Sequence, residues 1–121
     1  RPKAAVRALF SGLTTHDVRS VVEGLCPEDF AYVVRMIEAS QSGQGFLNDL
    51  QHRVRDLDTV TCPTLALYSP YDHAVRPENS QRLVPVLPHC EVVATSASSH
   101  LIWIGASAQE VWERRLHFLI E

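Results

Sequence analysis

The stretch "TLALYSPYDHAV" (64–75) decides the fold, together with "CEVVATSASSH" (90–100) further along the chain. Each begins with a short apolar run, at 64–69 and 90–95, rich in branched and aromatic residues and typical of a strand buried on both faces. Between them, "RPENSQRLVPVL" opens like a helix at Pro77, and Pro85 limits its length. The order strand, helix, strand implies a parallel pair joined by a right-handed crossover.

Helices are expected on both sides of this unit. Apolar residues at i, i+3, i+4 and i+7 predict three amphipathic helices before residue 40: Val6, Leu9, Phe10 and Leu13; Val18, Val21, Val22 and Leu25; Phe30, Val33, Val34 and Ile37. A short fourth helix is expected to carry Leu47, Leu50 and Val54 on one face. Ser107 and Glu110 have the spacing of a capping box and open a terminal helix, expected to pack on the sheet. Its apolar stripe is Ala108, Val111, Trp112, Leu116 and Leu119.

The composition excludes several classes of protein. A formal net charge of -3 over 121 residues, without a basic cluster, gives no electrostatic basis for binding nucleic acid. No apolar run approaches the roughly 20 residues that span a bilayer. The three cysteines (Cys26, Cys62, Cys90) suit neither a disulfide framework nor a metal pair, so we expect small core residues in a reducing, cytoplasmic compartment. The chain opens with Arg1 and not methionine, so we expect a piece of a longer protein.

Two ionisable residues follow the predicted strands. Asp72 comes a few residues after the first strand and His100 a few residues after the second. Adjacent parallel strands bring these loops side by side, within reach of a carboxylate–imidazole hydrogen bond. Such a carboxylate fixes the imidazole tautomer and stabilises the imidazolium of a general base. From spacing alone, the alternative stays open that Asp72 caps a turn and His100 is an ordinary loop histidine.

These stretches resemble the α/β-hydrolases. "TCPTLALYSPYDHAVRPENSQRLVPVLP" is similar to that family's penultimate strand, acid loop and following helix, and "CEVVATSASSHLIW" to its last strand and histidine loop. The resemblance covers residues 60 to 120. It implies a partial α/β-hydrolase fold, with 1–56 as a helical cap and 57–121 as the C-terminal part of the core. It also implies that Asp72 and His100 are the acid and base of a nucleophile–His–acid triad, and that Val75 and Leu101 lie near the substrate.

The sequence departs from the family pattern in two ways. Serine stands at Ser69 and at Ser98–Ser99, in neighbourhoods where the family commonly has glycine. There is also no G-x-S-x-G nucleophile elbow and no oxyanion-hole segment. Ser42 would reproduce the Ser, Asp, His order, but it follows a helix instead of a strand, so we interpret "SQSGQG" (40–45) as a helix end.

The resulting expectation is the C-terminal fragment of a hydrolase that acts on an ester or related acyl substrate, with the nucleophile outside this chain. No metal or organic cofactor is implied, and the fragment alone is expected to be inactive. We expect a homodimer or association with the missing N-terminal half, because two strands cut from a larger sheet leave an unpaired edge. The alternative is a non-catalytic module of hydrolase-like fold that binds a ligand or protein partner.

Overall fold

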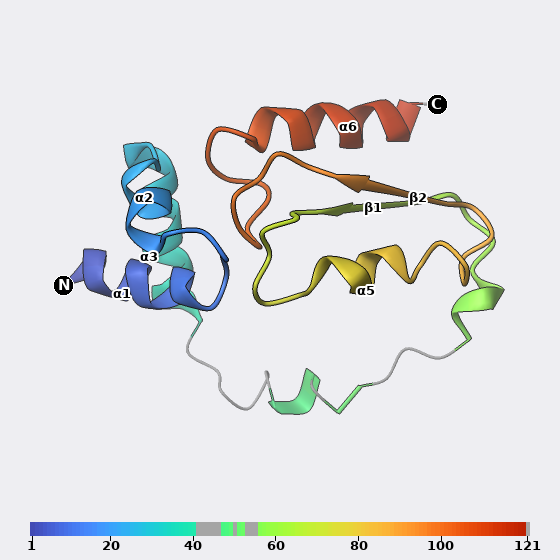
Figure 1. Ribbon diagram of the computed structural model, residues 1–121, viewed down its shortest axis with the longest axis horizontal. Helices are drawn as coiled ribbons and strands as arrows, with labels where there is room; N and C mark the ends of the chain where they lie inside the picture. The colour runs from blue at the N-terminus through green and yellow to red at the C-terminus, as the bar shows by residue number, and fades with distance from the viewer. Residues whose placement is uncertain (41–46, 50, 53–55, 121) are drawn as a thin grey trace.

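The computed structural model of the chain describes residues 1–40, 47–49, 51–52 and 56–120. Within these ranges, a two-stranded parallel sheet pairs β1 (Thr64–Tyr68) with β2 (Cys90–Ala94). In Figure 1, α5 (Pro77–Gln81) lies on one side of the strands and α6 (Ala108–Ile120) on the other. A short 3-10 helix, η1 (Leu57–Thr59), precedes β1. The predicted α/β class and the order strand, helix, strand, helix are confirmed.

The first 40 residues form the three predicted helices: α1 (Pro2–Ser11), α2 (Val18–Glu23) and α3 (Pro27–Ala39). Their ends follow from local chemistry. The Asp17 carboxylate accepts the backbone N–H of Ser20 at 2.8 Å and caps α2, and Pro27 occupies the first turn of α3. Gly12 and Gly24 stand at the C-caps of α1 and α2. Of the predicted fourth helix, residues 47–49 are helical, whereas Leu50, Val54 and Ser42 lie outside the described residues.

The main hydrophobic core joins the helices to the loop between β2 and α6, which we call the histidine loop (residues 95–107). The stripes of α1, α2 and α3 supply most of this core, and the histidine loop supplies the rest. Its buried members are Val6, Phe10, Val22, Val33, Leu101 and Ile104. The helical segment is therefore packed against the loop that carries His100.

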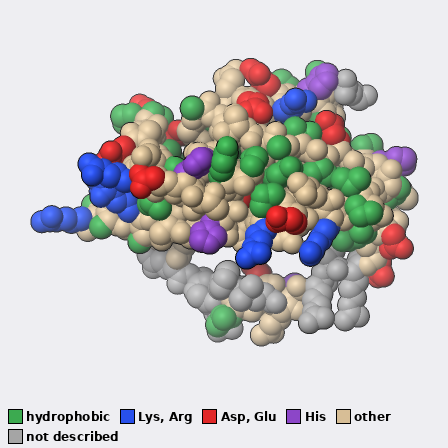
Figure 2. Space-filling model, viewed as in Figure 1, with side chains coloured by type: hydrophobic (Ala, Val, Ile, Leu, Met, Phe, Trp, Pro, Cys, Tyr) green, Lys and Arg blue, Asp and Glu red, His purple; other side chains and the backbone are tan. Residues whose placement is uncertain are grey.

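The expectation of strands buried on both faces is wrong for this chain. All five residues of β1 are half-buried, and no residue of either strand is fully buried. The stripe of α6 is also largely uncovered: Val111 is buried, but Trp112 is 56% and Leu116 61% exposed. Two strands with one helix on each side offer too little surface to bury both faces. Figure 2 shows hydrophobic side chains gathered over the part of the molecule that holds the sheet and its helices.

Local expectations at three other places need correction. The Glu110 carboxylate does not close a capping box; it accepts hydrogen bonds from the backbone N–H and hydroxyl of Ser96 in the histidine loop. These bonds lower the pKa of Glu110 below its usual value, and the bond from the Ser96 hydroxyl has the larger effect. Cys26 and Cys62 are exposed and not in the core. Of the helices described, none has both the length and the apolar content to cross a bilayer.

Candidate active site

Asp72 lies in the loop between β1 and α5, which we call the acid loop (residues 69–76). The loop turns around Ser69, a fully buried residue whose hydroxyl donates to the carbonyl oxygen of Ala97 in the histidine loop. The same hydroxyl accepts the N–H of Tyr71 at 3.0 Å, and the N–H of Asp72 donates to the carbonyl oxygen of Ser69 at 3.2 Å. A serine side chain thus organises this turn where the family commonly has glycine.

The serines of both loops take ordinary backbone conformations. Within the described ranges, a positive φ occurs at Asp56 and at Gly105. Ser69, Ser98 and Ser99 therefore need none of the freedom that makes glycine special. The departures noted in the sequence cost no backbone strain at these positions.

The Asp72 carboxylate is held at both of its oxygens. The side chain is 8% exposed, Oδ1 accepts the backbone N–H of Val75 at 2.8 Å, and Oδ2 lies 2.7 Å from Nδ1 of His100. A buried carboxylate is stable when its oxygens are paired in this way. This arrangement fixes the direction in which Asp72 presents Oδ2 to the imidazole.

His100 is held through its backbone as well as its ring. Its N–H donates to the carbonyl oxygen of Leu13 at 2.8 Å, and its side chain remains 35% exposed. With Nδ1 occupied by Asp72, Nε2 is the ring nitrogen that can exchange a proton with an external group. The geometry suits a general base whose tautomer is set by the carboxylate.

Strand pairing explains why the two loops meet. β1 and β2 run parallel with Tyr68 opposite Ala94, so both strands end at the same edge of the sheet. The N–H and hydroxyl of Thr95 both donate to the carbonyl oxygen of Tyr68, at 2.8 and 3.1 Å, and extend the pairing into the loops. The predicted side-by-side placement of the loops and the hydrogen bond between Asp72 and His100 are found in the structure.

The other residues singled out in the sequence have different surroundings. Val75 is 42% exposed and contributes its N–H to Asp72, whereas Leu101 is 5% exposed and belongs to the hydrophobic core. Their contact with substrate stays a prediction. His73 is exposed. Throughout the ranges described, no three histidine, cysteine or acidic side chains come together as metal ligands would.

Sequence reasoning missed the segment that follows α1. Thr14 forms an isolated antiparallel bridge with Asp72, and the N–H of Thr15 donates to the carbonyl oxygen of Tyr71 at 2.9 Å. The ring of His16 lies against that of Tyr71, with centroids 3.9 Å apart. A polar stretch after a helix is an ordinary loop pattern, so the sequence carries no signal for these contacts.

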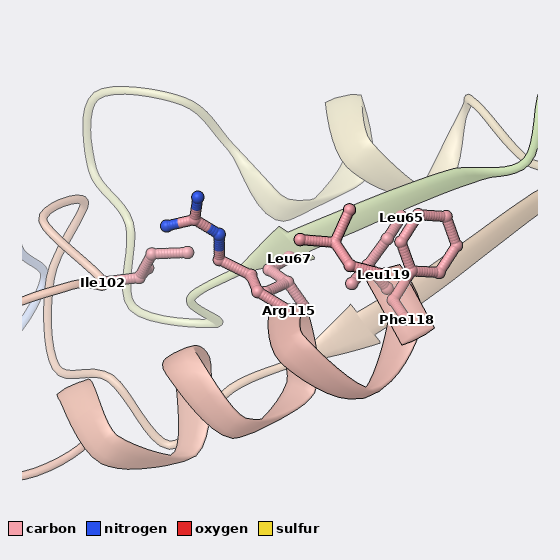
Figure 3. Close-up of a pocket in the computed structure, with 6 residues that line it drawn as sticks. All are labelled: Leu65, Leu67, Ile102, Arg115, Phe118 and Leu119. Atoms are coloured by element: carbon pink, nitrogen blue, oxygen red, sulfur yellow. The ribbon is translucent and has the colours of Figure 1, made fainter. Parts of the chain in front are cut away.

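Two hollows lie near these elements. One, of about 330 Å³, opens between α6 and β1 and is lined mostly by apolar side chains (Figure 3): Leu65, Leu67, Ile102, Arg115, Phe118 and Leu119. It does not include Asp72 or His100. The other, of about 490 Å³, lies between the start of α2 and the histidine loop, with His16, Ser20, Ser98 and Gly105 in its wall.

Comparison with known proteins gives two related proteins, and no family model matches the chain. A protein of Bacillus subtilis named as the uncharacterised hydrolase YcgS is 26% identical over 122 residues. The match covers 98% of this chain and 43% of that protein. Among solved structures, an α/β hydrolase fold protein from Nakamurella multipartita superposes with a TM-score of 0.76 and 25% identity. This superposition covers 94% of this chain and 44% of the solved chain, so the chain spans less than half the length of either relative.

Proposed function

Because the chain is related to the α/β-hydrolases and has part of their fold, we propose that it is the C-terminal part of a hydrolase in which Asp72 and His100 serve as acid and base of a nucleophile–His–acid triad. The observation that carries this proposal is the 2.7 Å contact between Oδ2 of Asp72 and Nδ1 of His100, made by a carboxylate that is 8% exposed. In this proposal, residues 57–121 belong to the catalytic core and residues 1–56 form a cap over it.

The proposed chemistry is acyl transfer from an ester. Nε2 of His100 takes the proton of a serine hydroxyl supplied by the rest of the protein, while the oxygen attacks the ester carbonyl. The imidazolium so formed is stabilised by Asp72 and returns its proton to the departing alkoxide. An acyl-enzyme remains. His100 then takes a proton from the water that attacks its carbonyl carbon, and passes this proton to the serine oxygen as the bond to the acyl group breaks and the acid leaves. A cysteine nucleophile would use the same pair in the same way. An aspartate nucleophile would instead attack the carbon of an epoxide or haloalkane and form an alkyl ester, and it would rely on His100 only to take a proton from the water that hydrolyses this ester.

This proposal can be tested by reading the coding sequence upstream of Arg1 and by assaying the longer protein that it encodes. We expect a strand, a G-x-S-x-G-type turn and a helix in that region, and hydrolysis of a generic aryl ester by the whole protein. His100→Ala should lower kcat by roughly 10²-fold to 10⁴-fold, the usual contribution of a general base. His73→Ala is the matched control, because His73 is an exposed histidine of the acid loop. Full activity of His100→Ala would refute the proposed role.

The 121-residue chain by itself should not turn over the same ester, since it has no nucleophile elbow. Turnover by this chain that disappears in His100→Ala but is retained by a serine-free variant would show that hydrolysis does not need a serine from outside it. In that case the account of a missing nucleophile would be wrong, while the role of His100 would stand.

We also propose that the uncovered faces of the sheet and of α6 are covered by the rest of the protein. Half-buried β1, exposed Trp112 and exposed Leu116 are surfaces that an isolated chain leaves in water. In this proposal the isolated chain self-associates at high concentration, whereas the longer protein does not. Light scattering at increasing concentration tests it, and a well-folded monomer would count against it.

The apolar hollow between α6 and β1 favours the alternative of a non-catalytic binding module. It offers an apolar ligand a volume of about 330 Å³, and neither Asp72 nor His100 lines it. A start codon immediately before Arg1, with no preceding strand, turn and helix, would support this alternative.

A further inference from the structure

The segment Leu13–Thr15 touches both loops that carry the Asp72–His100 pair. It runs between α1 and α2, and Figure 1 shows this connection beside the loops that leave β1 and β2. Toward the acid loop, the segment bridges to Asp72 and donates the N–H of Thr15 to Tyr71. Toward the histidine loop, the carbonyl oxygen of Leu13 accepts the N–H of His100.

Thr14 contributes a side chain to this junction as well as its backbone. Its side chain lies in the interior, with the residue 4% exposed. The hydroxyl donates to the carbonyl oxygen of Ser98 at 2.5 Å and accepts the backbone N–H of His16 at 3.0 Å. Thr14 therefore contacts Asp72 through its backbone and the histidine loop through its hydroxyl.

Such a junction matters because a carboxylate–imidazole hydrogen bond is sensitive to the spacing of the loops that carry it. A displacement of about 1 Å at a catalytic group can lower a rate by roughly 10²-fold. The two loops are joined directly by Ser69 and Thr95 near the strand ends. Thr14 adds a third connection farther from the strands. Its hydroxyl binds the carbonyl oxygen of Ser98, which is two residues before His100, and its backbone lies opposite Asp72.

We propose that Thr14 is a positioning residue: its buried hydroxyl, together with its backbone bridge to Asp72, holds the acid loop and the histidine loop at the spacing the Asp72–His100 hydrogen bond requires. Its relevance to catalysis rests on the proposed function above. Its effect on the hydrogen bond does not, and it is that effect which the experiment reads. The helical segment is thereby part of the machinery that aligns the pair, and not only a cover over it.

The test is proton NMR of the 121-residue chain, in which a hydrogen-bonded imidazole N–H of His100 gives a separate low-field signal. Thr14→Val keeps the shape of the side chain and removes the hydroxyl. We expect the His100 Nδ1 proton to exchange with solvent roughly tenfold faster in this variant, or its signal to vanish, as when a buried hydrogen-bond partner is lost. Thr14→Ser retains a hydroxyl and should restore slow exchange.

Thr15→Val is the matched control, because Thr15 is the neighbouring threonine, is exposed, and its hydroxyl makes a long contact of 3.4 Å to the carbonyl oxygen of Tyr71. It should leave the His100 signal unchanged. If the His100 Nδ1 proton of Thr14→Val exchanged as slowly as in the unmodified chain, the proposal would be overturned, even if the variant melts at a lower temperature. Equal loss of the signal in Thr15→Val and Thr14→Val would also overturn it.

Amide exchange in the unmodified chain gives a second test that does not depend on how Thr14→Val folds. The N–H groups of Thr15, His16 and His100 all donate into the junction, so we expect all three to be protected. Fast exchange of the His16 N–H would show that the hydroxyl of Thr14 does not hold its position. Neither measurement involves turnover, so absence of ester hydrolysis in the longer protein would leave this inference standing.

Discussion

Replacing Asp72 with asparagine should reverse the tautomer of His100, and the expected extent can be worked out from two distances. In the unmodified chain, Oδ1 of Asp72 accepts the N–H of Val75 at 2.8 Å and Oδ2 lies 2.7 Å from Nδ1 of His100. An asparagine side chain has one oxygen and one NH₂ group for these two positions. If its oxygen stays on Val75, its NH₂ faces Nδ1, which must then accept a hydrogen bond and leave the ring proton on Nε2.

The opposite orientation of the amide is less favourable. It sets the NH₂ group against the N–H of Val75, so that two donors face each other and a partly buried N–H loses its partner, at a cost of about 1–3 kcal/mol. Because each 1.4 kcal/mol is a factor of ten, roughly nine molecules in ten should carry the proton on Nε2. The free energy of unfolding should fall by about 1–2 kcal/mol, since two hydrogen bonds to a charged carboxylate become neutral ones.

Nitrogen-15 NMR of the imidazole at alkaline pH, where histidine rings are neutral, reads the tautomer directly. Asp29→Asn is a suitable control, because the Asp29 carboxylate accepts the N–H of Gly105 at 2.8 Å, whereas the His100 ring is paired with Asp72. It should leave the tautomer unchanged. If Asp72→Asn kept the proton mainly on Nδ1, the reasoning from the two distances would be refuted. In the longer protein the reversed tautomer should lower kcat sharply, because a protonated Nε2 cannot act as a base.

Three further predictions concern stability and assembly. Phe10→Ala should lower the free energy of unfolding by about 3–5 kcal/mol in urea titrations, because Phe10 is fully buried, whereas Tyr32→Ala, at a site 43% exposed, should cost much less. The pKa of Glu23 is lowered, mainly by the hydrogen bond that Arg19 donates, so the ionised carboxylate should stabilise the fold at neutral pH. The stability advantage over Glu23→Gln should shrink as the pH falls below 4.5, and urea midpoints of both proteins at pH 7 and pH 3 would show this. Leu116→Glu should reduce self-association in light scattering without lowering the helix content.

The parts of the fold that depend on local pattern could be predicted from the sequence. The stripe that includes Phe10 buries one face of α1, and the run that includes Tyr68 forms β1. The meeting of Asp72 and His100 also follows from sequence order, because parallel neighbours end at one edge of a sheet. Here the determining information lies within a few residues of each element.

Burial could not be predicted in the same way. The composition of β1 is that of a strand covered on both faces, yet every residue in it is half-buried, since burial depends on which neighbours are present. Cys26 shows the same limit at a smaller scale. It has the character of a core residue, but its place before Pro27 makes it the exposed N-cap of α3, where its sulfur accepts the N–H of Asp29.

The contacts of Thr14 were beyond prediction for a different reason. The contacts with Asp72 and Ser98 join residues far apart in the chain, and neither Thr14 nor Ser98 carries an unusual side chain. Only the packing of α1 against the histidine loop brings the hydroxyl to Ser98. A threonine after a helix has the same local pattern whether or not it reaches such a partner.

The sequence separations at this junction also imply an order of folding. Asp72 and His100 are 28 residues apart, whereas Thr14 and Ser98 are 84 apart, and closing the longer loop costs about 1 kcal/mol more in chain entropy. The contact with the smaller sequence separation is therefore expected to form first. The strand, helix, strand unit closes and brings Asp72 and His100 together before the N-terminal helices dock. In this expected order, the docking of Thr14 against Ser98 completes a junction whose acid and imidazole have already been brought together by the strands.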